Sequence, residues 1–435
     1  MPAGLRQRRA YHRTVDLAGD HAHRLDLTQP EYLRGRVGTA AALRALDAEH
    51  GGGFFDIPPE AEVDPAAADE CFAALGPVVD VQTHLVRPSR ITTDSAAALL
   101  GFLRMVEPER WRDPIDPEHL SAPAWASCVF GGSETSVALL TSPPGLEGDS
   151  VIDNADIAAA REVVDRYAGT GRVLTHTIVH PNAGPDELER MGEWSSRLRP
   201  AGWKVYTLWD PPGGPTGGWY LDDDLGAAFL DRVRELGPRI VCAHKGLAGP
   251  IPSLAPAAAS PRDVGPAAVA YPDIDFVVYH SGYDIDARHE EGAHDADPQR
   301  GVSRLVTSLA DARVPPSANV WAELGSTWSL ILRRPEEAAH VLGKLLLAVG
   351  EDRILWGTDS VWYGPPQPLI DAFRAFIIPE RLREAHGYPE LTPEVKQRIL
   401  GGNASALYGI EPKSFDHEVR RWLGEVQRNL DGRLA

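Results

Sequence analysis

The segment Val78-Val79-Asp80-Val81-Gln82-Thr83-His84 decides the fold of this chain. A short run rich in valine that ends on polar residues is typical of a strand buried on both faces, as in a parallel sheet. Side chains at the carboxyl end of such a strand project from the edge of the sheet. We therefore predict a buried strand whose tip presents His84.

Four later segments repeat this design. Each rises through apolar residues and stops on a residue that can bind a metal ion or transfer a proton. They are residues 239–244, ending at His244, residues 275–280, ending at His280, residues 319–323, ending at Glu323, and residues 353–359, ending at Asp359. The tips recur roughly every 40 residues, which fits one strand, one helix and their two loops.

Three further strands and the helical patterns between them complete an alternating order. The strands are predicted at residues 135–140, 173–179 and 203–208, and the helices at residues 94–105, 154–167 and 186–198. This alternation predicts an α/β protein with a parallel sheet and helices outside it. Eight units favour a (β/α)8 barrel of the TIM type over an open sheet, and no glycine-rich phosphate loop follows the first strand. In a barrel, all eight tips meet on one face.

The chain divides into three parts on this reading. We expect an N-terminal extension at residues 1–77, a barrel at residues 78–412 and an amphipathic C-terminal helix within residues 413–435 that packs on the barrel. The extension is polar at first and then carries predicted helices at residues 31–50 and 66–75. His21-Ala22-His23 has the spacing of metal ligands, but we assign it to a solvated tail.

The composition bounds the partners of the protein. Sixty-two acidic and 43 basic residues give a formal charge of -19, which argues against nucleic acid or an anionic membrane as a partner. No apolar run is long enough to span a membrane, and three cysteines are too few for a disulfide framework. We expect a cytoplasmic protein that acts on a small molecule, with a homodimer as one possible assembly.

The strand tips supply the side chains of a metal centre. A catalytic divalent ion is held by about three His and carboxylate ligands and keeps one position open. His84, His244 and Asp359 supply such a set, and Gln82, on the same side of the strand as His84, either ligates weakly or binds a ligand by hydrogen bonds. Water on such an ion becomes hydroxide near neutral pH, and Asp359 can take its proton. We expect one ion, zinc, with iron or manganese as alternatives.

The remaining polar tips have roles in acid–base chemistry or substrate binding. His280 is placed to polarise a carbonyl or to act as general acid or base, because histidine titrates near neutral pH. Glu323 is a substrate or acid–base contact, or a structural residue. Lys204 could be carboxylated and bridge a second metal ion, could bind an anionic group, or could form a salt bridge. Tyr206 and Trp362 suggest a flat or apolar substrate, with core packing as the alternative.

These residues carry a resemblance to a known family. The stretches involved are Asp80 to His84, His244, Tyr279-His280-Ser281-Gly282, Trp356-Gly357-Thr358-Asp359-Ser360 and Ile399 to Gly409. They resemble the amidohydrolase superfamily, and within it the amidohydrolase-related branch that includes aminocarboxymuconate semialdehyde decarboxylase, over about residues 78 to 412. The resemblance implies a distorted (β/α)8 barrel with a metal site at its carboxyl-end face.

The resemblance also implies roles for single residues. His84 corresponds to the second ligand of a first-strand pair, His244 to the fifth-strand ligand, His280 to the sixth-strand acid–base residue and Asp359 to the eighth-strand ligand. Where the family has His or Glu as the first residue of the pair, this chain has Gln82, which leaves the affinity and identity of the metal open.

The activity is left open between two reaction classes and a third, non-catalytic role. The branch contains hydrolases and metal-dependent, non-oxidative decarboxylases, and the same residues serve either chemistry. We favour hydrolysis of an amide, ester or ring carbonyl. The alternatives are decarboxylation of an aromatic or unsaturated acid, and a catalytically weak binding or scaffold protein.

Overall fold

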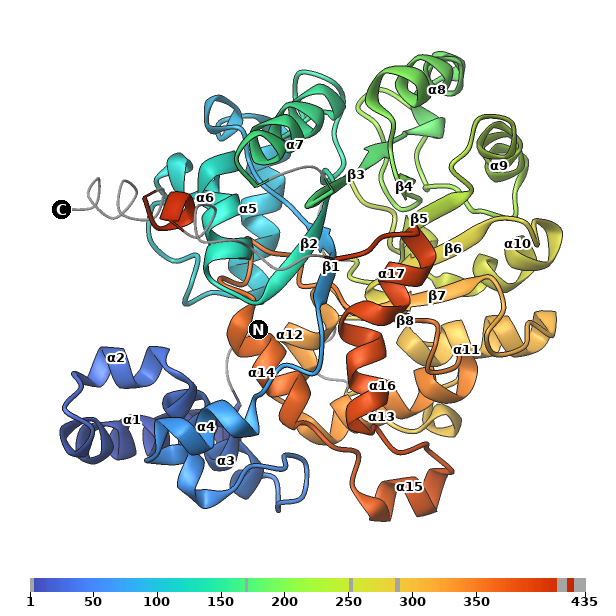
Figure 1. Ribbon diagram of the computed structural model, residues 1–435. Coiled ribbons are helices and arrows are strands. Elements are labelled where there is room, and N and C mark those ends of the chain that lie inside the picture. Colours follow the sequence, from blue (N-terminus) through green and yellow to red (C-terminus); the bar gives the residue numbers. More distant parts are fainter. Residues whose placement is uncertain (1–3, 169–170, 250–252, 286–289, 413–420, 426–435) are drawn as a thin grey trace.

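A single sheet of eight parallel strands, joined in sequence order, forms the centre of the molecule (Figure 1). The computed structural model describes residues 4–168, 171–249, 253–285, 290–412 and 421–425. The strands are β1 (Val78–Thr83), β2 (Thr135–Leu140), β3 (Val173–Ile178), β4 (Gly202–Tyr206), β5 (Ile240–His244), β6 (Asp275–Tyr279), β7 (Val320–Glu323) and β8 (Ile354–Leu355). The predicted α/β fold with eight parallel strands is therefore confirmed.

The sheet closes into a barrel where β1 meets the chain around β8. The backbone N–H of Val81 donates to the Trp356 carbonyl at 3.0 Å, and the N–H of Asp359 donates to the Gln82 carbonyl at 2.8 Å. This seam is irregular, because β8 is only two residues long and the pairing of β1 with β2 shifts register twice. The barrel is distorted at the strands that carry Gln82, His84 and Asp359.

A buried carboxylate stabilises this seam. Asp80 lies within β1 and is fully buried. Its Oδ1 accepts hydrogen bonds from the N–H groups of Gln82 at 3.2 Å and Thr358 at 3.0 Å, and its Oδ2 accepts one from the Thr358 hydroxyl. Burial raises the pKa of Asp80 to about 7, although these hydrogen bonds oppose the rise. Asp80 thereby fixes the backbone at two of the predicted site residues, at Gln82 itself and just before Asp359.

Helices surround the barrel, both between successive strands and after the last strand (Figure 1). They are α5 (Asp94–Val106), α6 (Ala122–Ala126), α7 (Asn154–Ala168), α8 (Pro185–Leu198), α9 (Asp224–Leu236), α10 (Val264–Ala270), α11 (Gly301–Ala312), α12 (Thr327–Ile331), α13 (Pro335–Ala348), α14 (Gln367–Ala375), α15 (Glu380–His386), α16 (Pro393–Gln397) and α17 (Asn403–Tyr408). Successive side chains of each strand point to opposite faces, so the core has one part inside the barrel and one part between the strands and the helices. Val79 and Val81 pack inside the barrel, whereas Val78 packs on the outer core.

The helical segment at residues 393–408 is interrupted. A π-helical turn at residues 398–402 separates α16 from α17. Gly401 approaches the start of β1 there, since a methyl group at this position would lie 2.2 Å from the Pro77 carbonyl oxygen. Leu407 and Tyr408 of α17 pack on the apolar cluster inside the barrel and so cover the end of the barrel opposite the strand tips.

The N-terminal region is helical, but its details differ from the prediction. The helix predicted at residues 31–50 is two helices, α2 (Gln29–Arg34) and α3 (Arg36–Glu49), because the extended backbone of Gly35 separates them. The prediction of a solvated tail before them is wrong. It is a helix, α1 (Leu5–Arg24), which buries a stripe of small side chains and includes His21 and His23. The second predicted helix is α4 (Pro65–Cys71).

The N-terminal helices lie beside α14 (Figure 1). The N–H of Asp56 donates to the Ala375 carbonyl at 2.8 Å, and the N–H of Ile377 donates to the Phe54 carbonyl at 2.8 Å. Arg36 forms ion pairs that include the buried Asp371 of α14. The extension therefore packs on the outside of the barrel, and none of its residues from 4 onwards lines the cavity described below.

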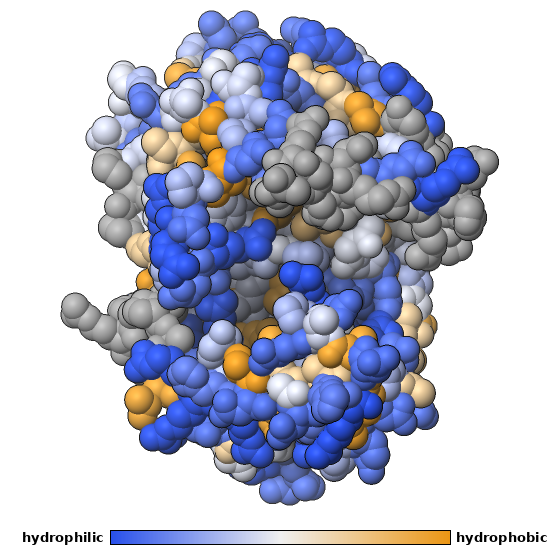
Figure 2. All heavy atoms as spheres, turned by 90° about the vertical axis from the view of Figure 1, so that its left-hand side faces the viewer, coloured by the Kyte–Doolittle hydropathy of each residue, from blue (hydrophilic) through white to orange (hydrophobic). Residues whose placement is uncertain are grey.

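Most of the predicted C-terminal helix falls outside the described residues, because residues 413–420 and 426–435 are not among them. Residues 421–425 are helical, and Leu423 is buried in the main core. None of the described helices is both long enough and apolar enough to cross a membrane. On the side of the molecule shown in Figure 2, hydrophilic residues predominate and apolar residues are scattered.

Candidate active site

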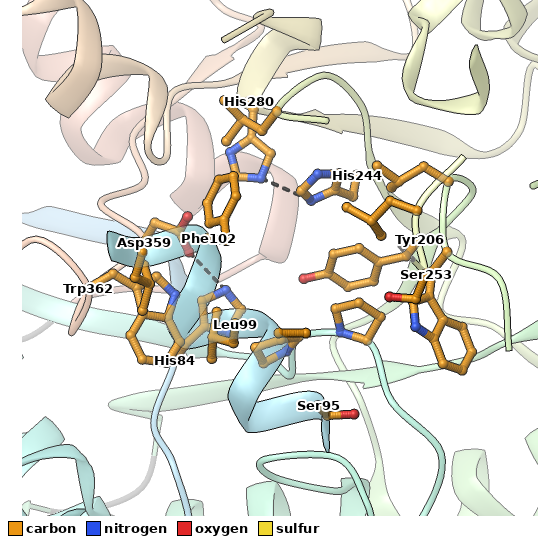
Figure 3. A pocket seen from close by; sticks show the side chains of 18 of the residues that line it. His84, Ser95, Leu99, Phe102, Tyr206, His244, Ser253, His280, Asp359 and Trp362 are labelled. Carbon is orange, nitrogen blue, oxygen red and sulfur yellow. Dashed lines mark hydrogen bonds and ion pairs between the residues drawn. The ribbon is translucent and has the colours of Figure 1, made fainter. Parts of the chain in front are cut away.

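A cavity of about 120 Å³ lies at the carboxyl ends of the strands. Five of its lining residues are tips of four strands or of the segments that follow them, namely Gln82, His84, His244, His280 and Asp359. Figure 3 shows four of them as two pairs, His84 with Asp359 and His244 with His280. Residues from the beginning, middle and end of the barrel thus converge on one space, as a closed barrel requires.

His84 and Asp359 form the first pair. His84 is buried, and its Nε2 lies 2.9 Å from Asp359 Oδ1. The other ring nitrogen, Nδ1, lies 2.8 Å from the Thr141 carbonyl oxygen, which can only accept a hydrogen bond. In a neutral His84, Nδ1 therefore carries the proton and Nε2 directs a lone pair towards a carboxylate oxygen. Two acceptors at this distance need a proton or a cation between them.

Asp359 is fixed on its far side. Its Oδ2 accepts a hydrogen bond from the Ser326 hydroxyl, which in turn accepts one from the Tyr363 hydroxyl at 2.9 Å. Burial alone would raise the pKa of Asp359, but the hydrogen bond and charge of His84, the charge of His280 and the Ser326 hydroxyl outweigh it and lower this pKa. Asp359 is therefore a carboxylate at neutral pH, with Oδ1 turned to the cavity.

Gln82 stands beside this pair. Its Nε2 donates to Asp359 Oδ1 at 3.2 Å, and its Oε1 is buried without a hydrogen-bond partner among the described residues. A buried amide oxygen without a partner costs about 1–3 kcal/mol. Gly325 is essential to this packing, since a methyl group there would lie 2.3 Å from Gln82 Oε1.

The residues around His84 fit a divalent ion in part. Two ligands of one ion lie about 3.0–3.4 Å apart when each bond is about 2.1 Å long, close to the separation of His84 Nε2 and Asp359 Oδ1. In the described part of the chain, no three His, Cys, Asp or Glu side chains converge closely enough to hold an ion by themselves. The unpartnered amide oxygen of Gln82 is the third ligand atom available beside the pair.

His244 and His280 form the second pair. His280 Nδ1 lies 2.6 Å from the Gly325 carbonyl oxygen, so Nδ1 carries the proton of the neutral ring. His280 Nε2 therefore accepts a hydrogen bond from His244 Nδ1 at 3.1 Å. Burial lowers the pKa of His280 to about 4 and that of His244 well below its ordinary value. Both rings are therefore neutral at pH 7, and His244 retains a lone pair on Nε2.

Glu323 lies behind His280 rather than at the cavity wall. It is fully buried and absent from the described residues that line the cavity. Its Oε2 accepts the N–H of His280 at 3.0 Å and its Oε1 accepts the N–H of Gly325, whose carbonyl holds the His280 ring. Burial raises the pKa of Glu323 to about 8. Through its two accepted hydrogen bonds the Glu323 carboxyl group anchors His280, whose backbone has a positive φ of 64° that needs such support.

Lys204 is also buried behind the cavity floor. Its Nζ has no hydrogen-bond partner among the described residues and lies 3.2 Å from the ring centre of Tyr279 and 4.8 Å from that of Tyr206. Burial lowers the pKa of Lys204 to about 7. The salt bridge considered for this lysine does not occur among the described residues, and its contacts are with aromatic rings.

The two predicted aromatic residues flank the histidine pairs. Trp362 stacks on His84 with ring centres 5.6 Å apart, and Tyr206 stacks on His244 at 4.7 Å. Both line the cavity. Each aromatic ring limits the rotation of the histidine on which it stacks. Trp362 and Tyr206 therefore fix the orientation of His84 and His244 and also form part of the cavity wall.

Sequence reasoning missed several residues of the site. Ser326 holds Asp359, and Leu99 and Phe102 of α5 form part of the cavity wall. The helical pattern of α5 was recognised, but no sequence signal shows that its apolar face covers a cavity. Asp80 did leave a signal, since a carboxylate within an apolar strand needs buried donors.

Solved structures of similar architecture include a probable 2-pyrone-4,6-dicarboxylic acid hydrolase from Acinetobacter baumannii, with 13% identity, 77% of this chain and 100% of that chain covered, and a TM-score of 0.47. The 2,6-dihydroxybenzoate decarboxylase from Rhizobium has 17% identity, 77% and 99% coverage, and a TM-score of 0.45. The 5-carboxyvanillate decarboxylase from Novosphingobium aromaticivorans, complexed with manganese, has 15% identity, 77% and 96% coverage, and a TM-score of 0.45.

No curated protein matches the sequence significantly. The sequence model of the amidohydrolase family, in contrast, matches residues 79–410. The match begins in β1, ends just after α17 and includes all the strand tips that line the cavity. The chain therefore belongs to the amidohydrolase family.

Proposed function

We propose that the protein is a metal-dependent hydrolase that acts on an amide, ester or ring carbonyl of a small molecule. One observation carries the proposal: His84 Nε2 and Asp359 Oδ1 face each other at 2.9 Å across a buried contact, with a hydrogen-bonded, neutral histidine pair at the same cavity. Acid–base groups, an anion and an enclosed space then occur together, which is typical of a catalytic site.

The ion would be held by His84, Asp359 and Gln82, with His244 as a fourth ligand through its free Nε2. Zinc, iron and manganese are all compatible with nitrogen and oxygen ligands, and a second ion would require carboxylation of Lys204. When bound, a divalent ion lowers the pKa of a coordinated water towards 7 and polarises a carbonyl group.

The side chains of the chain itself position the substrate and move the protons. Asp359 Oδ1 carries negative charge at neutral pH and can accept a hydrogen bond from an attacking water. When His244 Nε2 is not on the ion, a proton that arrives there can be passed on, since the Nδ1 proton of His244 then shifts to His280 Nε2 at 3.1 Å. Glu323 and Gly325 hold His280 in place for this transfer.

Decarboxylation of a small acid is the second candidate. The specific observation in its favour is the apolar wall formed by Leu99, Phe102 and Leu103. Apolar surroundings remove water from a substrate carboxylate and favour a transition state in which the charge is dispersed. The carbon that loses carbon dioxide would take its proton from the histidine pair.

Metal removal and reconstitution test the proposal. The purified protein would be stripped with a chelator, reloaded with zinc, iron or manganese, and assayed with a panel of small esters, amides and lactones, beside a panel of aromatic and unsaturated acids. We expect metal-dependent release of acid from the first panel and none from the His84→Gln variant. Release of carbon dioxide from the second panel alone would assign the decarboxylase, and no turnover with any metal would leave a binding or scaffold protein.

A further inference from the structure

The wall opposite the strand tips is built from one face of α5. Ser95, Leu99, Phe102 and Leu103 line the cavity, and their spacing places them on the same side of the helix. Leu247 and Leu254, which follow β5, line it too. A methyl group at Gly249 would lie 2.9 Å from the Phe102 ring, so α5 is packed closely onto the loop that follows β5.

This wall offers no positive charge. Among the described residues that line the cavity there is no Lys or Arg, and the imidazole and carboxylate groups are those of the polar floor, His84, His244, His280 and Asp359. Two buried lysines near the strand tips are oriented elsewhere. Lys204 lies among aromatic rings, and Lys245 forms an ion pair with Asp263 at 2.7 Å. A second carboxylate on a bound molecule would be buried without a partner, which costs several kcal/mol.

The size of the space limits the molecule further. The cavity volume of about 120 Å³ is similar to the roughly 150 Å³ of an apolar protein cavity that holds one benzene molecule. Leu99 and Phe102 are only half-buried, so a bound molecule can cover them and gain from the burial of apolar surface.

Resting on the proposed function, we infer that the substrate combines a single carbonyl or carboxyl group, placed at the polar floor, with an uncharged apolar body of about one ring that lies against α5. Leu99 and Phe102 determine this specificity. A substrate that carries a second carboxylate on its ring is rejected, because the α5 wall has no cation to receive it.

Binding of two related probes tests the inference without turnover. Trp209 and Trp362 line the cavity, so their fluorescence reports binding of benzoate and of isophthalate, which differ by one carboxylate. In protein reconstituted with manganese, benzoate should bind at least about tenfold more tightly than isophthalate. In the Leu99→Arg variant the order should reverse. The Ala97→Arg variant, on the exposed side of the same helix, should retain the preference for benzoate.

The outcomes separate this inference from the proposed function. Equal or tighter binding of isophthalate by the parent, or no reversal in a folded Leu99→Arg protein, would overturn the inference even if metal-dependent turnover is found. Failure of both probes to bind would overturn it as well. A tenfold preference that Leu99→Arg reverses, in a protein without metal-dependent turnover, would support the apolar subsite and contradict the hydrolase.

Discussion

On the β1 and β8 side of the cavity, His84 faces a carboxylate, whereas on the β5 and β6 side His280 faces another histidine. Both histidines lie at strand tips, both are buried, and in both Nδ1 donates to a backbone carbonyl. The partner of Nε2 is the difference. The first side is arranged to hold a positive charge next to Asp359, and the second keeps two neutral rings in hydrogen-bond contact.

The comparison shows that the position of a histidine on the barrel does not determine its role. The His84 side gathers an anion and an amide oxygen, which suits a cation. The His280 side has Glu323 behind it, but the oxygens of that carboxyl group accept backbone N–H groups and leave the ring uncharged. The His84 side therefore provides negative charge for a cation, and the His280 side provides groups for proton transfer.

The largest effect is expected from removal of the charge on the first side. Asp359→Asn keeps the shape of the side chain but loses the negative charge, and we expect kcat/KM to fall by about 10³-fold. Asp311→Asn, at an exposed position of α11, is the matched control and should leave kcat/KM unchanged. A loss of less than about tenfold in a folded Asp359→Asn protein would contradict the distinction between the two sides.

A second prediction concerns the seam that holds the first side in place. Asp80→Ala leaves the N–H groups of Gln82 and Thr358 buried without an acceptor, so the free energy of unfolding should fall by about 3 kcal/mol. Thermal and denaturant unfolding measure this loss. The control is Asp295→Ala, whose side chain is fully exposed. Stability equal to that of the parent would show that Asp80 does not support the seam.

On the second side, substitution of Glu323 tests whether this residue anchors His280 or contacts the substrate. Glu323→Gln can accept only one of the two backbone N–H groups, so His280 loses an anchor. We expect kcat to fall by about 10–100-fold, as for residues that orient a catalytic group, with KM and metal content unchanged. A rise in KM with unchanged kcat would instead show that Glu323 contacts the substrate.

The strand tips could be predicted from the sequence, but the contacts at the seam between β1 and β8 could not. The strand tips could be predicted, because apolar runs that end on His, Glu or Asp recur at the spacing of a βα unit. The partners could not, since His84 and Asp359 are separated by most of the chain and meet only after the barrel closes with a particular register. The same holds for Gln82 and Asp359.

The errors in the N-terminal region have a different cause. Helix α1 has a polar composition, and the pattern that stabilises it is a stripe of Ala10, Thr14, Ala18 and Ala22, which bury little apolar surface each. Hydrophobic periodicity is weak in such a helix, so its contact with α3 decides its structure. The break between α2 and α3 depends on one residue, Gly35, and the capping box of Thr28 and Glu31 fixes the start of α2.

The smallest predicted effect tests whether burial keeps histidines neutral. Burial lowers the pKa of His180 to about 4, below the ordinary value of 6.5. Between these values the unfolded chain binds a proton that the folded protein does not, so stability falls with pH from 6.5 downwards. The contribution of His180 is about 1 kcal/mol between pH 7 and pH 5.5. His180→Gln, which can still donate to the Gly145 carbonyl, should reduce the pH dependence of unfolding by this amount. An unchanged slope would contradict the neutral state.

The metal content of two matched variants tests the distinction between the sides most directly. Protein purified as the parent, His84→Gln and His280→Gln would be analysed for zinc, iron and manganese by mass spectrometry, with circular dichroism as the control for folding. We predict about one equivalent of metal in the parent and in His280→Gln, and a loss of metal in His84→Gln. Metal retained by His84→Gln and lost from His280→Gln would contradict the account.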